Sequence, residues 1–314
     1  MPGEAHYESY SILAESVSLA QAVEHYILAG RVEGKSRKTL QGYQEVLGAF
    51  VRVVGDRSLR ELTAWDVRRY LAGLRERGLS PHTIWTHYRV LHSFARWCLR
   101  ERLIERSPLD DVPPPRLPKP LPKVLDAEQV AALLRVARSE ARSKGKLGVR
   151  NLAMVLLMLD CGLRLSEVLG LRLEDVSLAT RTIRVHGKGN RERLVYMGNR
   201  TAKTLRAWLQ ARGVRAYSDH VFLDQKGEPL KARWVQTVVK RLGEQAGIKG
   251  LTPHTLRRTS ATLAARNGLG TFELQQLYGW AQIQTAAHYV ALAGSALREA
   301  HARASPVDRL LEGR

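Results

Sequence analysis

One tyrosine near the C-terminal end, Tyr289, has a hydroxyl that could do chemistry. It lies in the stretch QQLYGWAQIQTAAHYVAL, residues 275–292, between His288 and Val290. A phenol oxygen acts as a nucleophile when neighbouring groups activate it and stabilise the charge that develops during the attack. A tyrosine on a helix can equally fill a hydrophobic core, so the choice depends on the other groups that the chain brings to it.

His254 and Arg257 form one pair that could bind an anion. In LTPHTLRRTSA, Thr252 is a favourable N-cap and Pro253 suits a first turn, which predicts that a helix begins here. The imidazole and the guanidinium, three residues apart, then share one face at the positive end of that helix, where a phosphate can bind. His-x-x-Arg also occurs often by chance, and an exposed pair without a ligand fits the pattern equally well.

Arg164 and Glu167 form a second pair, in CGLRLSEVLGL. Arg164 follows Gly162, which is expected to end one apolar helix, and Glu167 lies in the first turn of the next. A guanidinium between two apolar helices is costly to bury without a partner, so the sequence predicts that Glu167 pairs with it. The pair could orient an arginine for binding, or it could simply join the two helices.

A further cation, Lys188, lies between two glycines in RTIRVHGKGNRERLVYMG, residues 181–198. Two β-rich runs flank GKGN, which predicts a hairpin with Lys188 at its tip. The lysine could be an ordinary turn residue, or its ammonium could reach into a site and donate a proton.

The elements before these residues are predicted to form an all-helical domain, residues 1–112. Helices are expected over 18–30, 36–55, 63–78 and 80–103, and the start signals are Ser36, Thr63 with Asp66, and Ser80 with Pro81. The prolines of PPPRLPKPLPK, residues 113–123, remove amide donors and disfavour helix. This segment is therefore predicted to be an extended linker between two domains.

The elements that must position the charged pairs lie in a mixed domain, residues 124–292. Asp126 is expected to cap a helix over 126–137, and an apolar helix runs through 152–162. The hairpin follows, then a possible short strand over 220–223, and further helices lead to the end. The predicted fold class is α+β, mostly helical, with a helical-bundle first domain and a small antiparallel sheet in the second.

The charge of the chain points to a polyanionic partner. The formal net charge is +20, and residues 1–117 hold 17 of the 50 Lys and Arg and 14 of the 30 Asp and Glu, so nearly all of the excess follows the linker. Nucleic acid fits this excess better than a membrane, because no run of 18 apolar residues is present. The start of the chain has no signal-peptide pattern. Cys98 and Cys161 are too few for a zinc site or a disulfide framework, which favours buried thiols in the cytoplasm, at the nucleoid if the partner is DNA.

The order of these motifs resembles the tyrosine recombinase (phage integrase) family, of the Xer-like or compact integrase kind. The resemblance covers residues 18–292, and SRKTLQGY in the first half is also similar to the core-binding domain of that family. Each motif alone is weak, but six positions in order with compatible spacing are specific. The positions that match are Arg164, Lys188, His254, Arg257, Trp280 and Tyr289.

The resemblance implies a catalytic role for each matched residue. Tyr289 would attack a DNA phosphate, form a 3′-phosphotyrosyl link and free a 5′-hydroxyl. Arg164 and Arg257 would clamp the non-bridging oxygens, because guanidinium forks match phosphate geometry. The remaining roles fall to His254 and Trp280 as hydrogen-bond donors, Lys188 as the proton donor to the leaving oxygen, and Glu167 as the group that orients the arginines. Neither a metal ion nor ATP nor another cofactor is implied.

Three positions depart from the pattern of the family. Trp280 stands where most relatives have His, and indole donates a hydrogen bond but cannot shuttle a proton. This shifts acid–base work toward His254 and Lys188. Arg258 stands where many relatives have His and is interpreted as a backbone contact or extra surface charge. Tyr278 replaces a common leucine and is interpreted as packing.

The resemblance also implies a partner and an assembly. The two domains would clamp double-stranded DNA, with base reading by helices in the major groove. The chain would be a monomer or dimer off DNA and a homotetramer on paired sites, joined through a tail helix within residues 293–314. Val307, Leu310 and Leu311 form an apolar stripe there, which could instead pack on its own domain. Three alternatives stay open: a type IB topoisomerase-like enzyme, a hairpin-resolving enzyme, and a non-catalytic DNA-binding accessory protein on the same fold.

Overall fold

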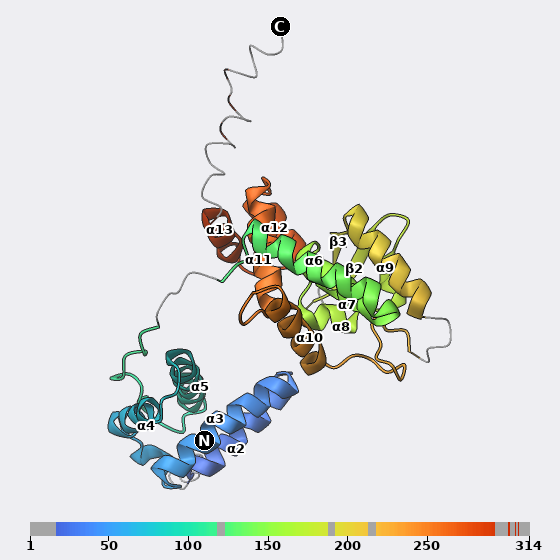
Figure 1. Ribbon diagram of the computed structural model, residues 1–314. Helices are drawn as coiled ribbons and strands as arrows, with labels where there is room; N and C mark the ends of the chain where they lie inside the picture. Colours follow the sequence, from blue (N-terminus) through green and yellow to red (C-terminus); the bar gives the residue numbers. More distant parts are fainter. Residues whose placement is uncertain are drawn as a thin grey trace, which may run out of the picture. The chain divides into compact units, whose positions relative to one another are not determined.

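The computed structural model describes residues 17–117, 123–187, 192–212 and 218–292, together with His301, Ser305 and Val307. The chain divides into two compact units, Met1–Pro120 and Leu121–Arg314. Figure 1 shows the helices of each unit and their labels. Most of the tail, and residues 118–122 of the predicted linker, lie outside the described residues, so the tail helix and its role in protomer contact stay predictions.

The described part of the first unit is all-helical. Its α-helices are α2 (Leu19–Val32), α3 (Arg37–Val54), α4 (Ala64–Glu76) and α5 (Pro81–Arg100), with a short 3₁₀ helix, η1 (Leu59–Glu61). Each α-helix begins after a hydroxyl side chain that accepts a backbone N–H of the first turn, which satisfies a donor that the helix cannot. The caps are Ser18, Ser36, Thr63 and Ser80, so the predicted helix starts of this unit are confirmed.

An aromatic cluster fills the core of this unit. Tyr26 on α2 stacks on Tyr43 of α3 and contacts Phe94 and Trp97 of α5, with ring centroids 5.4–5.5 Å from that of Tyr26. These rings tie α2, α3 and α5 together, since aromatic side chains bury large areas and pack with specific geometry.

The second unit is built around an apolar helix. Helices α6 (Ala127–Ser143) and α7 (Gly145–Leu159) form an antiparallel pair, and α7 also packs against α9 (Asn199–Arg212) and α11 (Pro253–Arg266). Residues 152–159 of α7 are buried all round, as expected for a helix in the middle of a domain. The C-terminal end of α7 therefore lies in the core, and the segment with Gly162 and Arg164 follows directly from it.

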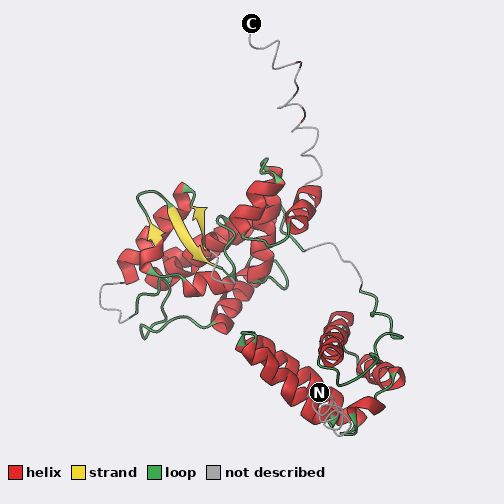
Figure 2. Cartoon of the chain, turned by 180° about the vertical axis from the view of Figure 1, so that it is seen from behind, coloured by secondary structure: helices red, strands yellow, loops and turns green. Residues whose placement is uncertain are grey.

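A small sheet and further helices complete the unit. The strands β1 (Val176–Ser177), β2 (Thr182–His186) and β3 (Glu192–Tyr196) form an antiparallel sheet in that order, with Val185 opposite Arg193. Figure 2 shows these strands among the helices of the unit. The remaining elements are α8 (Leu165–Gly170), η2 (Leu173–Asp175), α10 (Ala232–Gln245), α12 (Thr271–Tyr278) and α13 (Ile283–Leu292). The predicted fold class and hairpin are confirmed, while Lys188 at the hairpin tip lies outside the described residues.

The predicted strand over 220–223 is wrong. Only isolated bridges occur there, from His220 to Arg172 and from Leu223 to Pro229. Val221 donates its N–H to the carbonyl of Leu171 at 2.7 Å, and its own carbonyl accepts from the indole of Trp208 at 2.9 Å. The run is apolar because it crosses the core, where a loop and a side chain satisfy its backbone in place of a neighbouring strand.

Two properties expected from the composition can be checked in the described residues. Cys98 and Cys161 are both buried free thiols, as predicted. Within the described ranges, no helix is both long and apolar enough to cross a lipid bilayer.

Candidate active site

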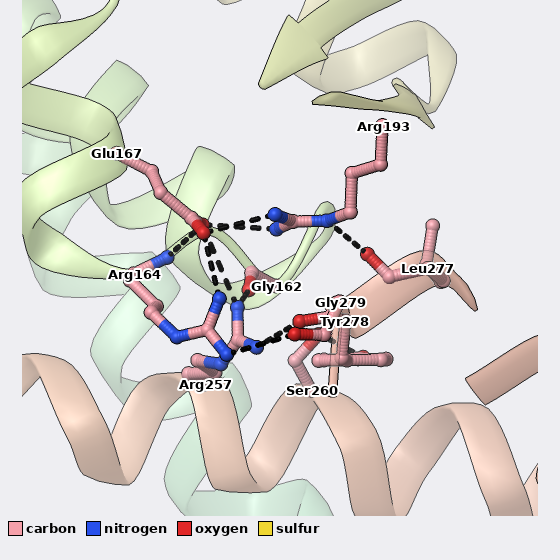
Figure 3. A network of polar contacts seen from close by, with 9 residues as sticks. All are labelled: Gly162, Arg164, Glu167, Arg193, Arg257, Ser260, Leu277, Tyr278 and Gly279. Atoms are coloured by element: carbon pink, nitrogen blue, oxygen red, sulfur yellow. Dashed lines mark hydrogen bonds and ion pairs between the residues drawn. The ribbon is translucent and has the colours of Figure 1, made fainter. Parts of the chain in front are cut away.

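A buried carboxylate, that of Glu167, lies at the centre of a cluster of arginines (Figure 3). Arg164 is the N-cap residue of α8, and its backbone N–H donates to Oε2 of Glu167 at 2.7 Å while its Nη1 donates to Oε1 at 2.8 Å. Nη1 of Arg257, from α11, lies 3.6 Å from Oε2. The predicted pairing of Arg164 with Glu167 is therefore present, and the same carboxylate also contacts Arg257.

Backbone carbonyls fix the two guanidiniums further. Arg257 donates through Nη1 to the carbonyl oxygen of Gly162 and through Nη2 to that of Tyr278. Arg164 donates through Nη2 to the carbonyl oxygen of Gly279 at 3.2 Å. These acceptors lie in the segment that follows α7 and at the C-terminal end of α12, so the two arginines are held by backbone from distant parts of the sequence.

The two guanidiniums differ in exposure. The side chain of Arg164 is 39% exposed and that of Arg257 is 4% exposed. Burial, followed by the charge of Arg164, lowers the pKa of Arg257 to about 10, which still leaves it charged at neutral pH. Arg164 thus has exposed surface for a ligand, while Arg257 is almost fully buried.

The carboxyl of Glu167 is ionised in this cluster. Burial by itself raises its pKa, but hydrogen bonds from Arg193 and from the backbone N–H of Arg164 outweigh that effect and hold the pKa at about 2. One negative charge therefore lies among three guanidiniums, those of Arg164, Arg193 and Arg257. The site keeps an excess of positive charge, as an anion-binding site requires.

Arg193 is a residue of this cluster that the sequence analysis did not single out. It projects from β3 and forms a two-pronged ion pair with Glu167, from Nη1 to Oε1 and from Nη2 to Oε2, both at 2.9 Å. The only sequence signal is the alternation of the strand, which turns Arg193 and Val195 toward the interior. An arginine at an inward position of a strand is unusual and indicates a buried carboxylate partner.

Three aromatic rings stack beside the arginines. The ring centroids of Tyr278 and Trp280 lie 4.9 Å apart, and those of Trp280 and Tyr289 lie 5.0 Å apart with the rings 4° from parallel. Cζ of Arg257 is 5.2 Å from the ring centroid of Tyr278 and 5.9 Å from that of Trp280. Tyr289 is 7% exposed, so its ring is packed on Trp280 next to the arginine cluster.

Tyr278 anchors this stack. Its hydroxyl lies 2.6 Å from Oγ of Ser260 on α11, and both side chains are buried. Its ring packs directly on the backbone of Gly162, where a Cβ atom would lie 2.3 Å from Cε1 of Tyr278. Gly162 also has φ +63°, so this position requires glycine for two reasons. The interpretation of Tyr278 as packing is supported, and its packing partners are the site residues themselves.

His254 lies at the start of α11, as the sequence predicts. Thr252 caps the helix by accepting the N–H of Thr255 at 3.1 Å, and Pro253 is the first helical residue. Partial burial of the imidazole, followed by the positive charges of Arg258, Arg257 and Arg164, lowers the pKa of His254. The lowered pKa favours the neutral form of His254, whose side chain is still partly exposed to solvent.

The structure thus brings together most of the residues that the sequence predicts. Arg164, Glu167 and Arg257 are in direct contact, Trp280 lies against Arg257, and Tyr289 lies against Trp280. Among the described residues, no three His, Cys, Asp or Glu side chains are grouped so that they could hold a metal ion.

Comparison with known proteins assigns both parts of the chain to one family. Residues 123–295 match the model of the phage integrase family, and residues 20–105 match the phage integrase N-terminal SAM-like domain. Tyrosine recombinase XerD of Halalkalibacterium halodurans is 33% identical over 282 residues, which cover 87% of this chain and 93% of the relative. Tyrosine recombinase XerC of Corynebacterium efficiens is 31% identical over 276 residues, which cover 88% and 87%.

A solved structure shows the same fold. The XerH site-specific recombinase, in a post-cleavage complex with a palindromic difH substrate, superposes with a TM-score of 0.74 over 90% of this chain and 83% of that one, at 23% identity. The chain belongs to the phage integrase family of tyrosine recombinases, enzymes that break and rejoin DNA.

Proposed function

We propose that this chain recombines DNA at specific sites by forming a covalent bond between Tyr289 and a 3′ phosphate, without a metal ion or ATP. The observation that carries the proposal is the grouping of two fixed guanidiniums, Arg164 and Arg257, with an aromatic stack that ends in Tyr289. Attack on a phosphodiester places extra negative charge on the non-bridging oxygens, and two guanidiniums can stabilise it.

The fixed positions of the arginines support a catalytic role beyond simple binding. Glu167 and three backbone carbonyls hold the guanidiniums in place before substrate arrives, so little reorganisation is needed as the charge develops. The charge of the guanidiniums supplies the stabilisation that a divalent ion supplies in other phosphoryl-transfer enzymes. This supports a metal-independent reaction.

We assign the proton transfers to His254 and Lys188. Neutral His254, with its lowered pKa, can donate one hydrogen bond and accept another, while Trp280 can only donate. We assign to Lys188 the donation of a proton to the 5′ oxygen as it leaves.

Double-stranded DNA is the proposed substrate, and the assembly on paired sites is proposed to be a homotetramer. The net charge of +20, most of it after residue 117, supports a polyanionic partner. The XerH recombinase was solved in a post-cleavage complex with its difH DNA substrate. The proposed work on DNA places the protein in the cytoplasm, and its buried free thiols fit a reducing compartment.

The assignment of the nucleophile is tested with a nicked DNA substrate that carries a cognate site. Cleavage releases a short strand next to the nick, rejoining is prevented, and the enzyme stays covalently trapped. Tyr289→Phe should bind this DNA with unchanged affinity and form no covalent complex, because only the attacking oxygen has been removed. The measurement is the fraction of DNA that migrates with protein under denaturing conditions.

The matched control is Tyr196→Phe, an equal change at an exposed tyrosine of β3. This variant should trap DNA at the rate of the unmodified protein. Covalent trapping by Tyr289→Phe would show that another residue is the nucleophile.

A further inference from the structure

Arg193 connects three elements of the site. From β3 its Nη1 and Nη2 bond to Glu167 on α8, and its Nε donates to the carbonyl oxygen of Leu277 on α12 at 2.9 Å. Its guanidinium also packs on Gly279, where a Cβ atom would lie 3.0 Å from Nη1. Gly279 adopts φ +58° and ends α12, directly before Trp280. One side chain thus contacts both the shared carboxylate and the turn that carries the indole.

The bonding of Arg193 differs from that of Arg164, the exposed guanidinium of the proposed phosphate clamp. Each of its three guanidinium nitrogens already donates to a protein oxygen, and its side chain is 12% exposed. Arg164, by contrast, is 39% exposed. The exposed side of Arg164 is open to a phosphate, whereas the largely buried Arg193 offers little surface to one.

We propose that Arg193 is a positioning residue for DNA strand cleavage, which acts through Glu167 and through the turn before Trp280. This inference rests on the proposed function. Arg193 bonds to both oxygens of Glu167 from β3, and Arg164 and Arg257 approach the same carboxylate from a different direction (Figure 3). The carboxylate then holds these two guanidiniums at the place where phosphate charge develops.

The loss of Arg193 would disturb two contacts at once. Glu167 would keep its charge but lose its two-pronged partner, so its carboxylate could rotate toward Arg164 and draw that guanidinium away from the substrate. The carbonyl of Leu277 would also lose its donor, which frees the turn at Gly279. Displacements of about 1 Å in such groups are expected to slow chemistry by up to roughly a hundredfold.

The test compares Arg193→Lys with Arg184→Lys in the full-length protein. Arg184 is on the neighbouring strand, pairs with Asp175 and is 45% exposed, so its replacement makes the same chemical change in the same sheet. Arg193→Lys keeps the charge but loses the fork. With the nicked substrate at saturating concentration, its trapping rate should fall by about 10- to 100-fold while DNA affinity stays unchanged, and Arg184→Lys should trap normally.

A second substrate separates positioning from direct phosphate binding. In a methylphosphonate at the scissile position, one charged oxygen is replaced by a neutral methyl group, so less positive charge is needed for cleavage. Arg164→Ala should recover part of its trapping rate on this DNA, because the lost function is charge stabilisation. Arg193→Lys should not recover relative to the unmodified protein, because its defect is geometric.

Several outcomes would overturn the proposal. Recovery of Arg193→Lys on the methylphosphonate would make Arg193 a direct phosphate ligand, and a normal trapping rate would make it a bystander. Thermal unfolding shows whether the variant is folded, and Arg193→Gln serves as a second variant. If neither folds, Arg193 serves folding and the proposal is wrong. Failure of the proposed function is distinct, since the unmodified protein would then trap no DNA.

Discussion

The central residue of the site is an acid, although the site is built to bind an anion. The carboxylate of Glu167 contacts three guanidiniums, and those of Arg193 and Arg164 form hydrogen bonds to it. Without this carboxylate the three cations would repel one another across a buried space. Glu167 therefore allows the chain to place several positive charges close together before DNA arrives.

The low pKa of Glu167 predicts a pH dependence of stability. Its pKa is about 2 in the folded chain, below its usual value of 4.5, so ionised Glu167 stabilises the fold above about pH 4.5. This contribution is lost as the pH falls from about 4.5 toward 2, and the difference of 2.5 units corresponds to roughly 3 kcal/mol. The free energy of unfolding of Glu167→Gln should be lower than that of the unmodified protein at pH 7, and the gap should narrow toward pH 3.

Denaturant unfolding across this pH range provides the measurement. Other carboxyls, among them Glu140, also have lowered pKa values, so only the difference between the two proteins reports on Glu167. Glu244→Gln, at an exposed residue that pairs with Lys240, is the matched control and should show a small, nearly constant difference. A gap that stays constant with pH would argue against an ionised Glu167 in the fold.

At the scale of elements, helix ends position the reactive groups. Arg164 is the N-cap of α8 and lies shortly after the C-terminal end of α7, and Gly279 is the C-cap of α12. Backbone carbonyls at such ends have no partner within the helix, and here those of Tyr278 and Gly279 accept from Arg257 and Arg164. The same unpaired groups that make helix ends costly to bury thus orient the guanidiniums.

The cap of α11 should contribute to both stability and activity. Thr252→Val removes the oxygen that accepts the N–H of Thr255 and keeps the shape of the side chain, so it should lower the free energy of unfolding by about 1 kcal/mol. Fraying of the first turn should also slow covalent trapping, because His254 lies in that turn. Thermal unfolding and the trapping assay measure the two effects.

A threonine within a helix serves as the control for this change. Thr237→Val removes a hydroxyl that bonds to the carbonyl of Arg233 within α10 and caps no helix end. Thr237→Val should lower the free energy of unfolding and the trapping rate less than Thr252→Val does. Equal effects of the two substitutions would show that the cap has no special role.

For the whole molecule, charge and fold are divided between two units. The second unit holds most of the net positive charge and the candidate site, while the first is a helical bundle with its own aromatic core. Each unit buries its own hydrophobic cluster. The clamp of the two units around DNA, which the resemblance implies, stays a prediction.

The affinity for DNA should depend steeply on salt. Lysine and arginine side chains that neutralise phosphates release bound counterions, so the logarithm of the affinity falls linearly with the logarithm of the salt concentration. If six or more phosphates are contacted, affinity should fall by roughly a thousandfold between about 50 and 200 mM salt. Fluorescence anisotropy with a labelled duplex measures the slope, and a nearly flat one would contradict extensive phosphate contact.

Much of the local structure could be predicted from the sequence. Ser36, Thr63 and Ser80 start helices in the first unit because side-chain caps and helical spacing act over a few residues, and the hairpin around residues 187–190 follows from glycines between β-rich runs. The prediction of a strand over 220–223 was wrong, because a local apolar run does not show whether another strand lies beside it.

The sequence by itself determined which residues are candidates for the chemistry, because Arg164, Glu167, Arg257, Trp280 and Tyr289 are recognised by type, order and spacing. Only the tertiary structure decided what holds them. The bond from Arg193 to Leu277 joins residues 84 positions apart, and the bond from Arg164 to Gly279 joins residues 115 apart. Such contacts depend on how the core packs around α7, and no local pattern encodes that.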